Sequence, residues 1–407
     1  MDVKRLVLVC GLFFLAACSE KAKDKESVFT SASSECPGQS NDKRYIVEWE
    51  NGETTVEEST SLEDFKNGFV TDNLNDIKKI HFDQTVQLLQ SDDLSFNPNA
   101  FADTPNWGQS MVKAEDLWAQ NISGENIRVG VVDSFVDTQH VQLKSRIDYN
   151  LGEIPNNGKD DDGNGYVDDY AGMSFAPSST RISPHGSHVS GIILADSTLG
   201  PIKGMAPKAL LVPAPFISND SGSLADAVNA LNYVASRNVR IINASWGGSR
   251  CIVNTLKSTF ENLNARGILV VVAAGNDGKD LDQSADYPAS FNMPNQITIA
   301  ASTIQDYMSS WSNSSFNFVH LAAPGESIYS TTPGNTYQSF QGTSMAAPFV
   351  SGAAALLMSA APNATAYQIK DALIRSADVV PAHEFRVQSR GRLNVKKALD
   401  YLRSIGL

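Results

Sequence analysis

Ser344 has the sequence setting of a serine nucleophile. The turn of residues 341–343 contains Gly342 and places this serine at the start of an apolar, alanine-rich helix predicted for residues 345–360. Pro348 falls in the first turn of that helix, where a missing N–H is tolerated. The positive end of the helix dipole favours negative charge beside the serine. A serine that only caps a buried helix has a similar setting, so Ser344 needs partners elsewhere in the chain.

Asp133 and His185 are candidates for those partners. Asp133 ends the apolar run of residues 127–132, which predicts a buried parallel strand, and open α/β sheets place their chemistry at the carboxyl ends of such strands. His185 ends a loop and begins a helix of small residues. His185 and His188 share one helix face, but no third nitrogen or sulfur ligand is adjacent, which favours a base over a metal pair. An aspartate after a strand is also often only a helix cap.

The order Asp133, His185, Ser344 is the order of the subtilisin triad. Residues 131–134, 185–191 and 342–348 resemble the three signature stretches of the subtilisin-like serine proteases, and the resemblance covers about residues 107–402. It implies a peptidase domain at residues 105–407 with a three-layer α/β/α sandwich and a mostly parallel central sheet. Phe135 departs from the family pattern, which usually has glycine there. A bulky side chain can shift the turn that holds Asp133, but we expect it to be tolerated because Asp133 itself is intact; reduced activity is the alternative. Ser187 keeps the hydroxyl of the usual threonine.

The resemblance also implies a role for each site residue. Ser344 attacks the peptide carbonyl, His185 accepts its proton and passes it to the leaving amine, and Asp133 orients the imidazole. The Asn276 side chain and the Ser344 backbone N–H form the oxyanion hole, although Asn276 alone reads as an ordinary turn residue. The substrate backbone adds to the edge of a strand as one more strand, and the first specificity pocket lies beside that edge. The residues implied for these two features are Ser245, Trp246, Gly247, Ala273, Ala274 and Gly275. Asp277 either lines the pocket and favours a basic side chain or is a solvated loop charge.

The charge of the chain divides it into two parts. Residues 20–106 hold 18 acidic against 8 basic residues, whereas residues 107–407 hold 26 against 22, and the net charge of −13 makes nucleic acid an improbable partner. Strand and helix patterns in residues 44–92 predict a small α+β module. Its length and position resemble the inhibitory propeptide of the same family, which implies that residues 88–94 lie in the active cleft and are cut. A permanent interaction domain is the alternative.

The first 43 residues have the features of an export signal and a tether. Two basic residues precede the apolar run of residues 6–15, and Leu15-Ala16-Ala17-Cys18 resembles a bacterial lipobox. This resemblance implies a signal peptide at residues 1–17, lipid on Cys18, and, because Ser19 follows, a place at the outer membrane. An ordinary secretory signal with an incidental cysteine is the alternative. Residues 18–43 read as a flexible tether, and Cys36 and Cys251 either pair or stay free.

An aspartate-rich loop at residues 156–169 predicts a calcium site. Its spacing matches the opening of a calcium loop, but Ala171 stands where an EF-hand has its bidentate glutamate. The expected ligands are Asp160, Asp162, Asn164, the Tyr166 carbonyl and Asp168. Similar loops occur as insertions in subtilisin-like proteases; a solvated acidic loop is the alternative.

The expected function is that of a serine endopeptidase, which hydrolyses polypeptides through an acyl-enzyme and is inhibited by its own propeptide. The alternative from another class is a catalytically inactive, calcium-dependent surface-binding protein, which Phe135 alone favours.

Overall fold

The computed structural model describes residues 23–30, 43–89, 104–177, 182–248 and 253–407. Cys18, Cys36 and Cys251, and all but the first two residues of the predicted cleavage segment 88–94, lie outside these ranges.

The centre of the larger domain is an eight-stranded sheet in the order β15-β16-β12-β11-β10-β8-β5-β6. Every neighbouring pair is parallel except β15 with β16 at one edge. The strands are β5 (Arg128–Asp133), β6 (Leu210–Pro215), β8 (Ile241–Ala244), β10 (Leu269–Ala273), β11 (Gln296–Ser302), β12 (Leu321–Pro324), β15 (Asp378–Val379) and β16 (Gly391–Arg392). Because both faces of the central strands are covered, they read as continuous runs of valine, isoleucine, leucine and alanine.

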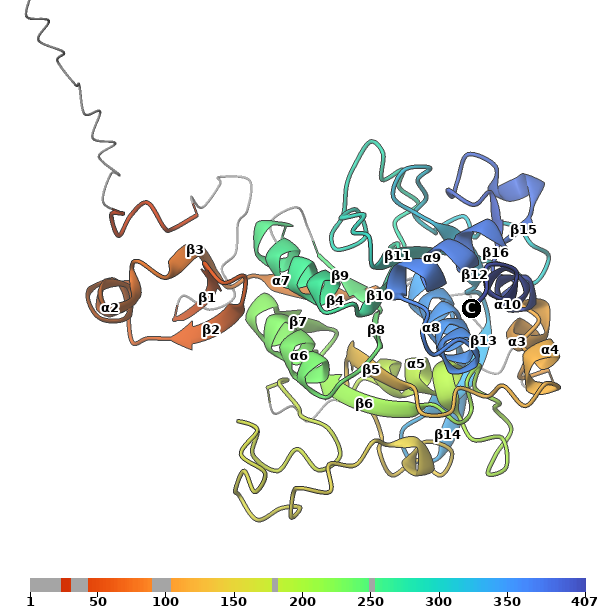
Figure 1. Cartoon of the computed structure of the whole chain (residues 1–407), viewed down its shortest axis with the longest axis horizontal. Coiled ribbons are helices and arrows are strands. Elements are labelled where there is room, and N and C mark those ends of the chain that lie inside the picture. Colours follow the sequence, from red (N-terminus) through yellow and green to blue (C-terminus); the bar gives the residue numbers. More distant parts are fainter. Residues whose placement is uncertain (1–22, 31–42, 90–103, 178–181, 249–252) are drawn as a thin grey trace, which may run out of the picture.

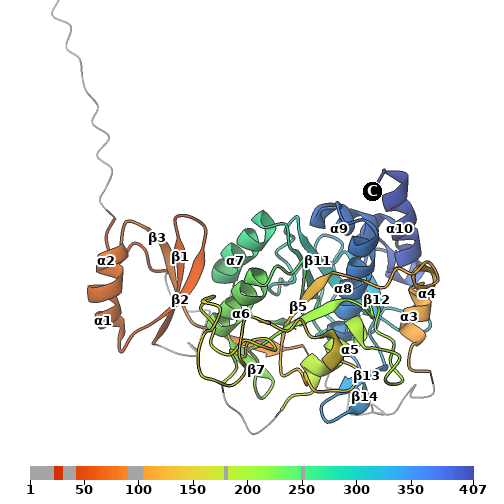
Figure 2. The same ribbon diagram turned by 60° about the horizontal axis from the view of Figure 1, so that its bottom comes forward.

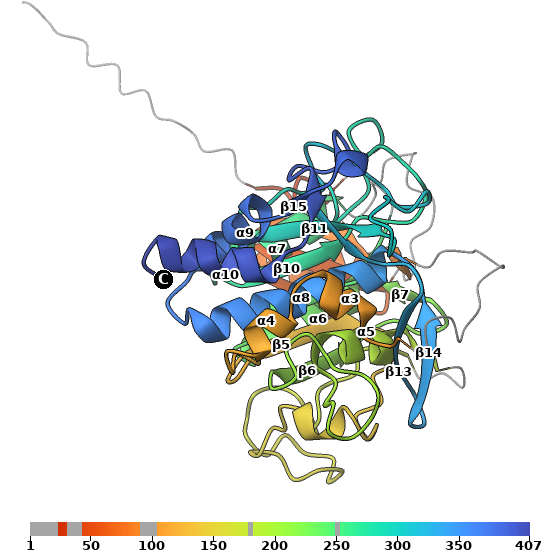
Figure 3. The same ribbon diagram turned by 90° about the vertical axis from the view of Figure 1, so that its right-hand side faces the viewer.

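Helices cover both faces of this sheet (Figures 1 and 3). Alternate residues of a strand point to opposite faces, so Val271 of β10 packs in the core on one face of the sheet, while Val270 and Val272 pack in the core on the other. The first face carries α3 (Trp107–Met111), α4 (Glu115–Trp118), α5 (His185–Leu194), α8 (Thr343–Ala360), α9 (Ala366–Arg375) and α10 (Val395–Ser404); the second carries α6 (Leu224–Ser236) and α7 (Val253–Ala265). The predicted three-layer α/β/α sandwich is thereby confirmed.

The helix that begins beside Ser344 is the central helix of the first face. It spans Thr343–Ala360, so it starts two residues before the predicted range. It is long and apolar enough to cross a membrane, but 89% of it is buried inside the fold, so it is a core helix of this domain. A hairpin of β13 (Ile328–Thr332) and β14 (Thr336–Phe340) lies beside α5, and short 3-10 turns occur at Lys144–Arg146 and Pro381–His383.

The predicted α+β module is present at the N-terminal side of the domain, next to α6 and α7 (Figure 2). Its antiparallel sheet has the order β2-β1-β3, from β1 (Arg44–Trp49), β2 (Thr54–Glu58) and β3 (Ile77–Phe82). A helical stretch packs on it, composed of α1 (Leu62–Phe65), the π-turn Lys66–Val70 and α2 (Thr71–Asn73). Phe65 stacks on Tyr45 with ring centroids 4.0 Å apart, so the module has an aromatic core of its own.

Part of the segment that we expected to be a flexible tether packs on this module. Val28 is buried, and residues 28–30 lie along β3, where Thr30 N–H donates to the Ile80 carbonyl and Ile80 N–H donates to the Val28 carbonyl. Residues 28–30 therefore lie against the sheet of the module and are not part of a free tether.

Candidate active site

Asp133 and His185 form a buried, hydrogen-bonded pair. Asp133 is the last residue of β5 and His185 the first of α5, and the Asp133 Oδ1 to His185 Nδ1 distance is 2.7 Å. With Nδ1–H donating to the carboxylate, Nε2 of a neutral imidazole is an acceptor. This Nε2 is buried and has no hydrogen-bond partner within the described residues. The imidazole is thus oriented by an acid and has its other nitrogen free to accept a proton.

Phe135 does not disturb this pair. Phe135 is 37% exposed, and the Asp133–His185 contact beside it is intact. Two hydrogen bonds join the turn to helix α5: Gly186 N–H donates to Ser134 Oγ at 3.0 Å, and Ser187 Oγ accepts from Asp137 N–H at 2.9 Å. A Cβ at Gly186 would lie 2.4 Å from the Ser134 carbonyl oxygen, so helix α5 needs a glycine here to approach the turn.

Ser344 lies at the same edge of the sheet, where it contacts Ser245. The register pairs Val132 with Ala244, which places the next residues, Asp133 and Ser245, side by side at the carboxyl ends of β5 and β8. Ser245 Oγ donates to the Ser344 carbonyl at 3.0 Å. Ser344 Oγ lies 3.1 Å from the Ser245 carbonyl oxygen and 2.9 Å from that of Leu89. The structure therefore brings Ser344 to the edge that carries Asp133.

Asn276 points at the same carbonyl group. Its Nδ2 donates to the Leu89 oxygen at 2.7 Å, while its Oδ1 accepts from Thr343 N–H at 2.9 Å and from Thr343 Oγ1 at 2.8 Å. Thr343 Oγ1 in turn accepts from Gly275 N–H at 3.0 Å. The Thr343 bonds fix which end of the amide faces the cleft. The Leu89 carbonyl oxygen thus lies between a hydroxyl and an amide donor.

Leu89 reaches this position because the preceding strand lies in a cleft. Strand β4 (Thr85–Leu88) pairs antiparallel with β9 (Trp246–Gly247) on one side and β7 (Ser221–Ser223) on the other. Trp246 and Gly247 thus pair with the chain's own strand β4, whereas Ser245 contacts Ser344. The β7 edge was missed, because Ser-Gly-Ser has no hydrophobic pattern. Ala273, Ala274 and Gly275 line the same cleft, of about 860 Å³, as Leu89.

His188 belongs to a different network from His185. Its Nε2 lies 2.9 Å from the Ile328 carbonyl oxygen and 3.0 Å from that of Gln338, and its ring stacks on Phe340. Burial lowers the pKa of His188 to about 3, so the ring is neutral at ordinary pH. The two histidines therefore do not form a metal pair.

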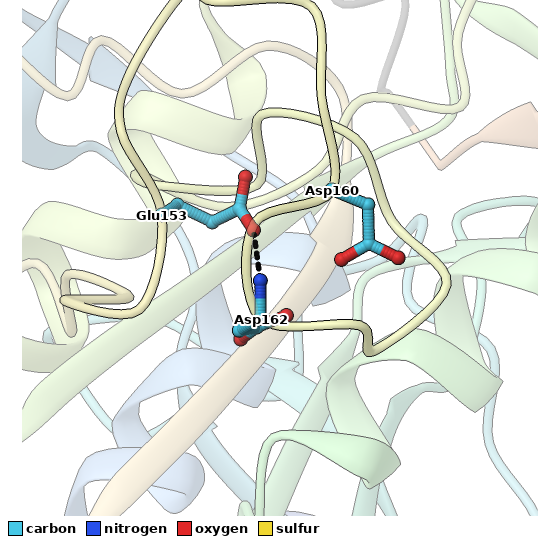
Figure 4. Close-up of side chains that lie close together, drawn as sticks. All are labelled: Glu153, Asp160 and Asp162. Carbon is cyan, nitrogen blue, oxygen red and sulfur yellow. Dashed lines mark hydrogen bonds between the residues drawn. The ribbon is translucent and has the colours of Figure 1, made fainter.

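The acidic loop brings two of the predicted metal ligands together and adds one. Asp160, Asp162 and Glu153 offer carboxylate oxygens that all lie within 4.8 Å of one another (Figure 4). Glu153 is buried; its Oε1 accepts from the N–H groups of Asp161 and Asp162, and its Oε2 has no hydrogen-bond partner in the described part of the chain. Glu153 was missed because it lies outside the spacing of the loop motif.

The other predicted ligands make contacts within the loop or with helix α6. Asp168 accepts from the N–H groups of Asn157 and Gly158, both at 2.9 Å, and so closes the loop. Asn164 Nδ2 donates to Asp162 at 3.2 Å, and the Tyr166 ring packs edge-on against Tyr233. A hydrogen bond from Asn150 lowers the pKa of Asp162, which keeps this carboxylate ionised.

Comparison with known proteins identifies the family. Residues 124–398 match the model of the subtilase family. The major intracellular serine protease of Bacillus subtilis (strain 168) is 38% identical over 256 residues, which are 62% of this chain and 74% of that protein. Subtilisin E of the same organism is 32% identical over 328 residues, covering 79% and 77%. Subtilisin-like protease 2 of Plasmodium falciparum is 32% identical over 323 residues, 76% of this chain and 23% of that protein. The chain therefore belongs to the subtilase family of serine endopeptidases.

Proposed function

We propose that this chain hydrolyses peptide bonds through Asp133, His185 and Ser344, with Asn276 as an oxyanion donor. The observation that carries the proposal is the Leu89 carbonyl oxygen, 2.9 Å from Ser344 Oγ and 2.7 Å from Asn276 Nδ2. The hydroxyl that would attack the carbonyl carbon and the amide that would stabilise the oxyanion both contact this one peptide group, which is the proximity that acyl transfer needs.

The reaction follows from these positions. Ser344 Oγ attacks the carbonyl carbon, and its proton passes to His185 Nε2, the buried acceptor without another partner. Asp133 stabilises the imidazolium, while Asn276 Nδ2 stabilises the oxyanion. His185 then protonates the leaving amine as the C–N bond breaks. Water, activated by the same imidazole, hydrolyses the ester on Ser344 and regenerates the enzyme.

We further propose that the N-terminal module inhibits the enzyme until the bond after Leu89 is cut. Strand β4 fills the substrate-binding edges, so no substrate can enter while it is bound. Three further contacts hold the module on helix α6: Arg44 pairs with Asp226 at 2.6 Å, Asn232 donates to the Thr54 carbonyl at 2.7 Å, and Asp83 accepts from Ala225 N–H at 2.9 Å. Asp83 thereby places a negative charge at the helix N-terminus.

The anchor and the inhibitor would then be parts of the same fragment. We infer from the lipobox that lipid on Cys18 holds the precursor at the outer membrane. Because Cys18 precedes Leu89 in the chain, cleavage after Leu89 leaves the lipid on the inhibitory fragment. The matured peptidase is then retained only by the contacts with that fragment, together with any Cys36–Cys251 disulfide. Dissociation of the cut fragment would both open the cleft and release the peptidase from the membrane.

The acidic loop fits a structural Ca²⁺ ion held by Glu153, Asp160 and Asp162. Carboxylate oxygens are the ligands that Ca²⁺ prefers, and a buried, unpartnered Glu153 Oε2 beside two more carboxylates is costly without a cation. When bound, the ion would neutralise these charges and brace the loop. The neighbouring Asp169 connects the loop to α6 through Arg237 and Tyr233, so the ion would stabilise the fold rather than take part in the reaction.

An inactive surface-binding protein is not supported. The sequence feature that favoured it, Phe135, leaves the 2.7 Å contact between Asp133 and His185 intact.

Full-length wild-type chain, Ser344→Ala and Ser359→Ala test the proposal. Ser359 lies near the far end of the same helix and is a matched control. We expect the wild type and Ser359→Ala to give a catalytic fragment that reacts with a fluorophosphonate. Its mass should be that of a chain beginning at Gln90. Ser344→Ala should fold, stay intact and remain unlabelled. A folded wild type that is neither cut nor labelled would refute the proposal, as would cleavage by Ser344→Ala at the same bond.

A further inference from the structure

Asn276, the proposed oxyanion donor, lies in a loop of irregular backbone. The loop follows strand β10 and runs from Ala274 to Lys279. Backbone of this kind lacks the repeating hydrogen bonds of a helix or a strand, so its polar groups need other partners. The place of the donor therefore depends on what holds this loop.

The side chain of Asn313 holds the loop on both sides of the donor. Its Nδ2 donates to the Ala274 carbonyl at 3.1 Å. Its Oδ1 accepts from the N–H groups of Asp277 and Lys279, at 3.0 Å and 2.9 Å. An asparagine amide has both donors and an acceptor with two lone pairs, so one side chain can satisfy all three backbone groups.

The backbone around Asn313 fits closely against the same loop. Its N–H donates to the Gly275 carbonyl at 2.8 Å, and Gly278 N–H donates to the Trp311 carbonyl at 2.7 Å. Gly275 has a φ of +106°, and a Cβ there would lie 2.3 Å from Asn313 Nδ2. The loop can therefore approach this asparagine only through a glycine.

Asn313 is remote from the substrate-binding surface. It is fully buried in the connection between β11 and β12 and is not among the described residues that line the cleft, whereas Gly275 and Asn276 are. Buried hydrogen bonds of this kind are costly to leave unmade, so the loop is fixed before any substrate binds. Any effect of Asn313 on the reaction must pass through the loop that it holds.

We propose that Asn313 is a positioning residue of the reaction, which sets the place of Asn276 Nδ2 through the loop backbone. An oxyanion donor is most effective when it is already aimed at the position where negative charge develops. Thr343 orients the amide of Asn276, while Asn313 fixes the backbone from which that side chain projects. The inference rests on the proposed peptidase function and adds to it a residue that does not touch the substrate.

A double-mutant cycle on the matured enzyme tests the proposal. It combines Asn313→Ala with Asn276→Leu, and the measured quantity is kcat for one leucine-containing peptide, at a temperature well below unfolding. If Asn313→Ala does not fold, Asn313→Ser, which keeps a smaller polar group, takes its place in the cycle.

Asn295→Ala is the matched control. Asn295 is also buried, and its Nδ2 donates to a backbone carbonyl, that of Ile268, at 2.6 Å. It directly precedes β11, at the end of the sheet opposite to the cleft. Thermal unfolding reports the stability that each variant loses, separately from its kcat.

We expect Asn313→Ala to lower kcat by about tenfold, which is part of the roughly 10²–10³-fold loss expected when the donor itself is removed. In the Asn276→Leu background the same change should alter kcat by less than about twofold, because no donor is left to misplace. Asn295→Ala should lose stability and keep the kcat of the wild type.

Three results would overturn the positioning role and leave the peptidase function standing. They are an equal fall in kcat in both backgrounds, an unchanged kcat in Asn313→Ala, and an equal fall in Asn295→Ala. A matured wild type that does not cleave the peptide would overturn both proposals.

Discussion

Thr343 should control the reaction rate through Asn276, without touching the substrate itself. Its hydroxyl donates to Asn276 Oδ1 and accepts from Gly275 N–H, and its own N–H donates to the same Oδ1. The amide of Asn276 is therefore held with Nδ2 towards the Leu89 oxygen. Thr343→Val removes the hydroxyl at nearly constant volume, whereas Thr343→Ser keeps it.

The size of the effect follows from what each bond does. Removing Asn276 Nδ2 altogether, as in Asn276→Leu, should lower kcat by about 10²–10³-fold, a magnitude taken from subtilisin, another member of this family. Thr343→Val leaves the donor present but holds it by one bond instead of two, so we expect a fall in kcat of about fivefold, one such bond being worth roughly 1 kcal/mol. The same change leaves the buried Gly275 N–H without a partner, which costs about 1–3 kcal/mol of folding stability.

Two measurements separate the catalytic effect from the structural one. Peptide hydrolysis at a temperature well below unfolding should show a lower kcat and a nearly unchanged KM, because the oxyanion donor acts mainly in the transition state. The rate of self-cleavage after Leu89 should fall by the same factor. Thermal unfolding of each variant reports the separate loss of stability.

Thr343→Ser is the control for this reasoning. We expect it to match the wild type in kcat, since the hydroxyl and both of its bonds remain. If Thr343→Val and Thr343→Ser have the same kcat, or if Thr343→Val changes only KM, the orientation of Asn276 does not depend on this threonine and the reasoning is wrong.

Three other predictions concern the loop, the core and the anchor. Saturating Ca²⁺, at about 100 times its Kd, should stabilise the wild type against unfolding by about 2.7 kcal/mol relative to chelator-treated protein. In a melting assay, Glu153→Gln should lose most of this stabilisation. An equal response of the wild type and the variant would exclude Glu153 as a ligand. Burial lowers the pKa of Lys370 to about 8, below the roughly 10.4 of an unfolded lysine. Between these pH values the unfolded chain therefore binds more protons than the folded chain. The free energy of unfolding of the wild type should rise from pH 8 to pH 10, relative to Lys370→Met, by on the order of 2–3 kcal/mol. If urea unfolding gives a difference between the two proteins that does not change with pH, the prediction is wrong. In cell fractionation, the wild-type inhibitory fragment should stay with membranes while the matured peptidase is released, and Cys18→Ala should free both; a peptidase that stays on membranes after salt and reductant washes would contradict release by maturation.

The sequence alone predicted the fold class and the residues proposed for catalysis because their signals are local. Each strand that ends at the site is a short apolar run. Asp133 stands at the end of such a run, and His185 and Ser344 each stand where a loop gives way to a helix. The charge difference between the two parts of the chain likewise separated the N-terminal module from the peptidase domain. These patterns depend only on which faces of an element are buried.

The tertiary structure decided which distant residues meet in the cleft. The sequence narrowed the cleavage segment to residues 88–94, but only the pairing of β4 between β7 and β9 singles out Leu89 as the residue whose carbonyl faces Ser344. Glu153 at the acidic loop has no motif of its own. It lies in an irregular segment, where contacts between remote residues set the path of the chain and no periodic pattern predicts which side chain will point into a site.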